Sequence, residues 1–184
     1  MFKKTLFLLF VFLQCIILNC SHAHDSDFNN SNPTEVIVKL DAITVNKPVK
    51  DKIYIEITEY SSINKAKEYR IPTYPKHWLI KDLPKLKNTI LWNGIIQDSE
   101  NKKLIISLVD NDYPPLDSDQ PLGSVKLTLT NKNDKINIDW DKAGFKEPIN
   151  IQKISSSDGS EHVTFKMQSK RSEYTVGFFV KTNP

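Results

Sequence analysis

Alternation of apolar and polar residues with a period of two is the feature that most constrains this fold. In the segment DKIYIEITEY, Ile53, Ile55 and Ile57 point to one side of an extended chain, and the residues between them point to the other side. Apolar residues at helical spacing do not run for three turns anywhere in the 184 residues, and only 62–68 could form one helical turn. We therefore expect a chain built from strands.

Nine segments show short β-branched or aromatic runs bounded by Asn, Asp, Lys, Gly and Pro. They are residues 35–45, 51–60, 89–97, 103–109, 122–130, 134–140, 148–154, 161–167 and 173–180. In the first segment the alternation changes phase between Leu40 and Ile43, which predicts a bulge. The nearly continuous apolar run of 104–109 is typical of a central strand that is buried on both faces. This pattern predicts an all-β fold, an antiparallel β-sandwich, with the three Trp residues packed in its core or at its edges.

The first 19 residues have the layout of a secretory signal peptide. Lys3 and Lys4 precede the apolar run TLFLLFVFLQCIIL. This run is shorter than the ~20 apolar residues that a membrane span needs. We therefore expect residues 1–19 to be removed from the mature protein.

Cys20 directly follows the apolar run, in the segment IILNCS. This segment resembles a bacterial lipobox, in which the Cys becomes the lipidated first residue, although Asn19 stands where Gly, Ala or Ser is usual. Spirochaete lipoboxes are looser at that position. We expect a lipid anchor on Cys20, a polar tether over residues 20–34 and a sandwich domain over residues 35–184. Cleavage after Ala23, which would release a secreted protein, is the alternative.

Several classes of function find no support in the sequence. The formal net charge is only +3 and no stretch is strongly basic, so we expect no nucleic-acid partner. The sequence contains no His-Glu-x-x-His, no Gly-x-Ser-x-Gly and no phosphate-binding Gly loop. Removal of residues 1–19 would leave Cys20 as the single cysteine, which excludes a disulfide within the chain. We expect a protein that is not an enzyme.

The segment LVDNDYPPLDSDQPLG, residues 108–123, carries four aspartates within ten residues: Asp110, Asp112, Asp117 and Asp119. Like charges on one short loop repel each other, by ~1 kcal/mol per pair at 4 Å in water. A divalent cation would turn this cost into binding energy, and calcium takes six to eight hard oxygen ligands. The segment therefore predicts a calcium-binding loop, and a solvated acidic turn is the alternative.

The same segment resembles the calcium loop of C2 domains, which are β-sandwiches, many of which bind calcium at one end and then dock to phospholipid. Those domains share an apolar strand, Asp-x-Asp, a further Asp, and an apolar residue with Gly. In this chain the end of the strand and Asp-x-Asp are residues 108–112, the further Asp is Asp117 or Asp119, and Leu122-Gly123 follows. Trp92-Asn93 matches part of a motif that C2 domains often carry one strand earlier. The loop from Asp110 to Gly123 is two residues longer than the usual pattern. The first calcium loop of C2 domains corresponds here to TVNKPVKD, residues 44–51, in which Asp51 is the one acid and stands between lysines. The resemblance implies calcium ligands at Asp51, Asp110, Asp112 and Asp119, with Asp117 as a substitute, and contact with a membrane or partner through Tyr113 and Leu116.

Together these features predict a lipid-anchored binding module of the bacterial cell envelope, at the outer membrane, with calcium as a cofactor. The acidic loop end would engage a protein or membrane partner. A structural lipoprotein that docks an envelope assembly without metal is one alternative. A secreted adhesin or toxin is the other.

Overall fold

The computed structural model describes residues 33–47, 52–61, 66–111, 119–133, 135–144, 149–155, 160–168 and 172–183. Within these residues it contains eleven strands and one 3-10 helix. They are β1 (Thr34–Lys47), β2 (Lys52–Ser61), β3 (Lys67–Ile71), β4 (Trp78–Leu79), η1 (Ile80–Lys85), β5 (Ile90–Ile96), β6 (Asn101–Asp110), β7 (Gln120–Lys132), β8 (Lys135–Ala143), β9 (Ile149–Ser155), β10 (Glu161–Gln168) and β11 (Glu173–Asn183). No helix in these ranges is long and apolar enough to cross a membrane.

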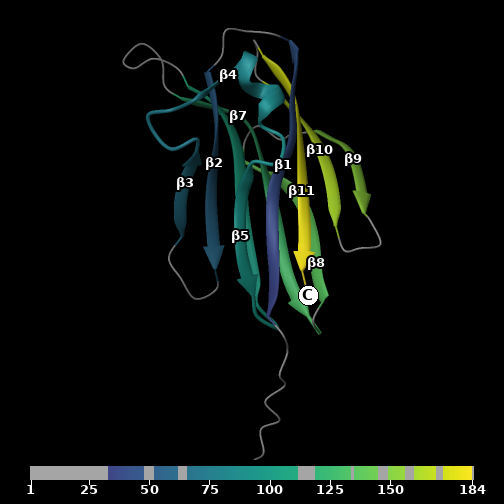
Figure 1. Ribbon diagram of the computed structural model, residues 1–184. Helices are drawn as coiled ribbons and strands as arrows, with labels where there is room; N and C mark the ends of the chain where they lie inside the picture. The colour runs from purple at the N-terminus through teal and green to yellow at the C-terminus, as the bar shows by residue number, and fades with distance from the viewer. Residues whose placement is uncertain are drawn as a thin grey trace, which may run out of the picture. The chain divides into compact units, whose positions relative to one another are not determined.

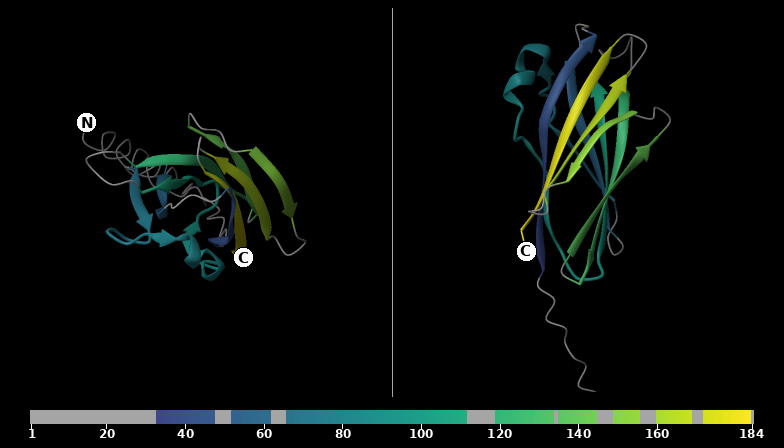
Figure 2. Two further views of the ribbon diagram at one scale, coloured as in Figure 1. Left: turned by 90° about the horizontal axis from the view of Figure 1, so that it is seen from above. Right: turned by 90° about the vertical axis from the view of Figure 1, so that its right-hand side faces the viewer.

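The strands form two antiparallel sheets that pack face to face, as Figure 1 and Figure 2 show. One sheet has the order β5-β1-β11-β10-β9, and the other has the order β3-β2-β6-β7-β8 with β4 paired to β2. The predicted all-β antiparallel sandwich is therefore confirmed. The segment after residue 147 belongs to the same sandwich, because β11 pairs with β1.

The core fills the space between the two sheets with the inward residues of each strand. Ile53, Ile55 and Ile57 of β2 are buried, as the alternation predicts. Trp140 of β8 stacks on Phe178 of β11 across the two sheets, with ring centroids 5.4 Å apart. Such aromatic pairs add to the free energy of burial and fix how the two layers face each other.

Two details of the strand pattern are confirmed and two are corrected. The pairing of β1 with β11 shifts between Leu40 and Ala42, which is the predicted bulge. All three Trp residues pack in or against the core. Residues 67 and 68, expected in a helical turn, belong to β3, because they pair with β2. In β6, the central strand, only one face is fully buried, since Ile105 and Ser107 on its other face are half-buried.

Candidate functional site

The loops that carry the candidate calcium ligands leave the sandwich at the same end, because β1 and β6 both run toward it. Asp110, the last residue of β6, pairs with Ile53 of β2. The backbone N–H of Asn111 then donates to the carbonyl oxygen of Lys52 over 2.6 Å. Strand β2, which follows Asp51, and strand β6, which comes before Asp112, are thus hydrogen-bonded to each other up to this end of the sandwich. We call this end of the sandwich, which holds Asp110, Asn111 and Asp119, the acidic end.

Two of the five predicted calcium ligands are described, and they are Asp110 and Asp119. The other residues singled out by the sequence lie outside the described residues: Cys20, Asp51, Asp112, Tyr113, Leu116 and Asp117.

The two described aspartates stand on opposite faces of their sheet. Asp110 continues the inward alternation of Ile106 and Leu108 and is half-buried. Asp119 lies on the outer face, where its Oδ2 accepts a hydrogen bond of 2.9 Å from the hydroxyl of Tyr54. An ion bound by both carboxylates therefore has to lie beyond the strand ends, where side chains from both faces can converge.

Tyr54 links Asp119 to a fixed positive charge. The guanidinium carbon of Arg70, on β3, lies 3.7 Å from the centre of the Tyr54 ring, a distance at which a cation is attracted to the ring face. Arg70 Nη2 also donates to the carbonyl oxygen of Lys76 over 2.7 Å and to Oδ1 of Asn111 over 3.5 Å. Both Arg70 and Asp119 contact Tyr54, so a guanidinium lies in the neighbourhood of this carboxylate and offsets part of the repulsion among the acids.

The surroundings of Tyr54 change its acidity. Burial, the hydrogen bond to Asp119 and the negative charges of Asp119 and Glu56 raise the pKa of Tyr54 to about 12, against a small opposing effect of Arg70. At neutral pH the phenol is therefore a stable donor that orients the Asp119 carboxylate. The sequence contained a signal for this contact, because Tyr54 interrupts the polar face of β2. The contact with Arg70 could not be read from it, since β2 and β3 pair only in the folded chain.

The chemistry of the acidic end suits calcium in part. Asp110 and Asp119 supply hard carboxylate oxygens, but an ion with six to eight ligands needs further oxygens from the adjoining loops. Among the described residues, no group of three or more His, Cys, Asp or Glu side chains is arranged to hold a metal ion. A calcium site here therefore depends on residues of the loops between β1 and β2 and between β6 and β7.

No protein-family model matches this chain, and no curated protein is significantly similar to it in sequence. The class of protein that the fold defines is the antiparallel β-sandwich.

Proposed function

We propose that this protein is a lipid-anchored binding module of the bacterial cell envelope, with a C2-like sandwich that holds calcium at its acidic end. The observation that carries the proposal is the pairing of β2 with β6 up to their ends, through the hydrogen bond between Asn111 and Lys52. It anchors the loop that contains Asp51 and the loop that contains Asp112 and Asp117 at the ends of two neighbouring strands. Carboxylates from neighbouring loops at one end of a sandwich are what a C2-like calcium site needs.

The direction of β1 supports a protein partner over a phospholipid surface. A tether from Cys20 enters the sandwich at Thr34, and the acidic end begins past Lys47 at the other end of the same strand. At ~3.3 Å per residue, these 14 residues separate the two ends by roughly 45 Å. A domain held at Thr34 by this tether can present its acidic end away from its own membrane, where an envelope or external protein can reach it.

Calcium should stabilise the protein if the acidic end binds it. Saturation at 100 times the dissociation constant adds ~2.7 kcal/mol to the free energy of unfolding, which raises the melting temperature by roughly 5–10 °C for a chain of this size. The measurement is a thermal unfolding curve with calcium and with a chelator. Asp110→Asn and Asp119→Asn should each reduce the shift, because each removes a carboxylate.

Asp139→Asn is the matched control, since Asp139 is exposed in the middle of β8. It should leave the calcium response intact. An unchanged melting temperature with saturating calcium, or a response that survives both Asp110→Asn and Asp119→Asn, would contradict the calcium proposal. That result would favour the metal-free alternative, a structural lipoprotein docked in an envelope assembly.

A further inference from the structure

The strand β1 loses its neighbour on one side halfway along its length. Its pairing with β5 runs from Thr34 to Lys39, and the last backbone bonds on that side join Leu40 to Thr89 and Asn88. On the other side β1 stays paired with β11 as far as Lys47. From Asp41 to Lys47, no strand among the described residues pairs with the outer edge of β1. We call this segment the free edge of β1.

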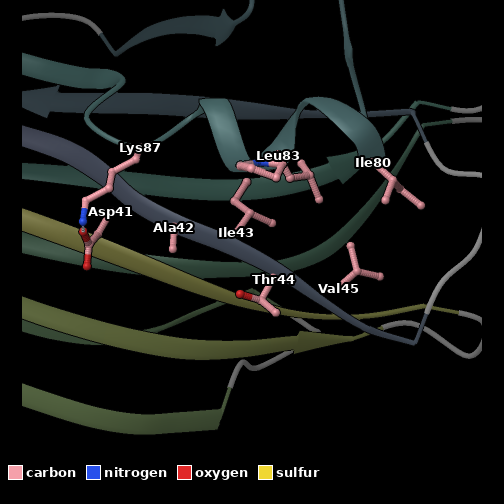
Figure 3. A pocket seen from close by; sticks show the side chains of 9 residues that line it. Asp41, Ala42, Ile43, Thr44, Val45, Ile80, Leu83 and Lys87 are labelled. Atoms are coloured by element: carbon pink, nitrogen blue, oxygen red, sulfur yellow. Dashed lines mark ion pairs between the residues drawn. The ribbon is translucent and has the colours of Figure 1, made fainter.

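An unpaired sheet edge presents backbone N–H and C=O groups that another extended chain can pair with. The bulge at Asp41 and the insertion of η1 before β5 are what create this edge here. The helix η1 does not pair with β1, but it runs alongside the free edge and forms the opposite side of the space next to it. Figure 3 shows side chains of β1 and η1 facing each other across the space between them.

This space is a groove of about 420 Å³ with an apolar wall on each side. Ile43 and Val45 contribute from the strand, and Ile80, Leu83 and Pro84 contribute from the helix. The volume lies within the range of ~300–1,000 Å³ that is typical of ligand pockets. Both walls offer apolar side chains to an extended chain that lies along β1.

The charges around the groove favour an acidic occupant. Its two nearby acids already have partners: Asp41 is held by Lys87 at 3.9 Å and by Nδ1 of His162 at 3.4 Å, and Asp82 accepts from the N–H of Leu79. The exposed charged side chains of the segments that form the groove are basic: Lys87 lines the groove and pairs with Asp41, Lys47 ends β1, and Lys81 and Lys85 lie on η1. A ligand with apolar residues for the groove and carboxylates at its ends complements this border.

We propose that the groove between the free edge of β1 and η1 binds an extended, acidic-flanked apolar peptide of a partner protein, as a strand added beside β1. The added strand supplies the backbone partners, and alternate side chains fill the apolar walls. The edge of a second folded copy does not fit, because η1 stands beside the same edge in each copy. The chain's own segment 20–32 fits poorly, since it offers Phe28 as its one large apolar residue. This inference does not depend on calcium at the acidic end.

The test uses the purified protein and three fluorescent heptapeptides, with binding followed by fluorescence polarisation. The first peptide alternates Val and Thr between terminal Asp residues, the second has Lys in place of the Asp residues, and the third is the first with alternate backbone nitrogens methylated. We expect the first peptide to bind, and the other two to bind at least tenfold more weakly. The methylated peptide keeps every side chain and loses only the donors that pair with a strand edge.

Two exposed positions test the location of the site without touching the core. Pro84→Asp places a carboxylate in the apolar wall, and Lys87→Glu reverses a charge at the border, so each should weaken binding at least tenfold. Lys103→Glu, on an exposed position of β6 away from the groove, should leave binding unchanged. Circular dichroism confirms that the variants are folded.

Four outcomes would overturn the proposal. The first is that the first peptide does not bind at millimolar concentration. The second is that the methylated peptide binds as tightly as the first peptide. The third is that folded Pro84→Asp and Lys87→Glu variants bind the first peptide as tightly as the parent protein does. The fourth is an occupant from the protein itself, seen either as self-association that Pro84→Asp abolishes or as peptide binding that requires removal of residues 1–32.

Discussion

At the scale of single residues, Tyr54 is the side chain that organises the described part of the acidic end. It donates to Asp119, packs under Arg70 and lies on the outer face of β2 while its neighbours fill the core. The cluster explains how a carboxylate can be held beside other acids before any ion binds. The phenol fixes the direction of the carboxylate, and the guanidinium reduces the local negative potential.

Tyr54 should make the stability fall in strong alkali. Its pKa is about 12 in the folded protein against 10.0 for the free side chain, so the folded state keeps a proton that the unfolded chain loses. The contribution to stability is complete below pH 10 and declines as the pH rises from 10 to 12. Burial raises the pKa of Tyr69 to about 12 as well, so both phenols contribute to the decline.

Urea denaturation measured across this pH range tests the assignment. Tyr54→Phe should give a shallower loss of unfolding free energy between pH 10 and 12 than the parent, and Tyr69→Phe should give a separate reduction. A Tyr54→Phe protein with the parental slope would mean that this phenol titrates normally.

At the scale of elements, a glycine at position 123 allows a strand of one sheet to lie close to a strand of the other. The pairing of β6 with β7 shifts at Leu122, so that Leu122 and Gly123 both face the core. A side-chain carbon on Gly123 would lie 2.9 Å from Cγ of Met167 on β10. The glycine therefore lets β7 and β10 pack closely across the sandwich, near the acidic end.

Gly123→Ala should destabilise the protein by about 1–3 kcal/mol, because the added methyl group overpacks the core against Met167. Gly177→Ala is the matched control on β11, since a carbon there meets its nearest neighbours at an ordinary 3.5 Å. Chemical denaturation compares the two, and the control should be neutral or slightly stabilising. Equal stabilities for the two variants would show that the contact with Met167 relaxes without cost.

At the scale of the whole molecule, the first and last strands close the same sheet. Because β1 lies between β5 and β11, the entry of the chain at Thr34 is held by hydrogen bonds on both sides. A pull on a tether from Cys20 would be met by an inner strand of a sheet. This arrangement suits an anchored domain.

N-terminal mass spectrometry of the protein from bacterial membranes tests the anchor. We expect acyl chains on Cys20, and Cys20→Ser should abolish acylation and release the protein from the membrane fraction. Cys15→Ser, within the apolar run, should not change either result. A mature chain that begins at His24 without acyl chains would instead support the secreted alternative.

The amino-acid pattern by itself determined nine of the eleven described strands, their inward faces and the bulge in β1, because the period of two and its phase are local properties of the chain. It also determined which loop is acidic. Only the tertiary structure decided that Tyr54 reaches Asp119 and Arg70 packs on Tyr54, that Asp110 and Asp119 face opposite ways, and that β5 leaves half of one edge of β1 unpaired. These facts depend on which strands become neighbours, and pairing joins residues far apart in sequence, such as Asp41 and His162. No local pattern records that choice, since strands of the same composition can pair in many orders.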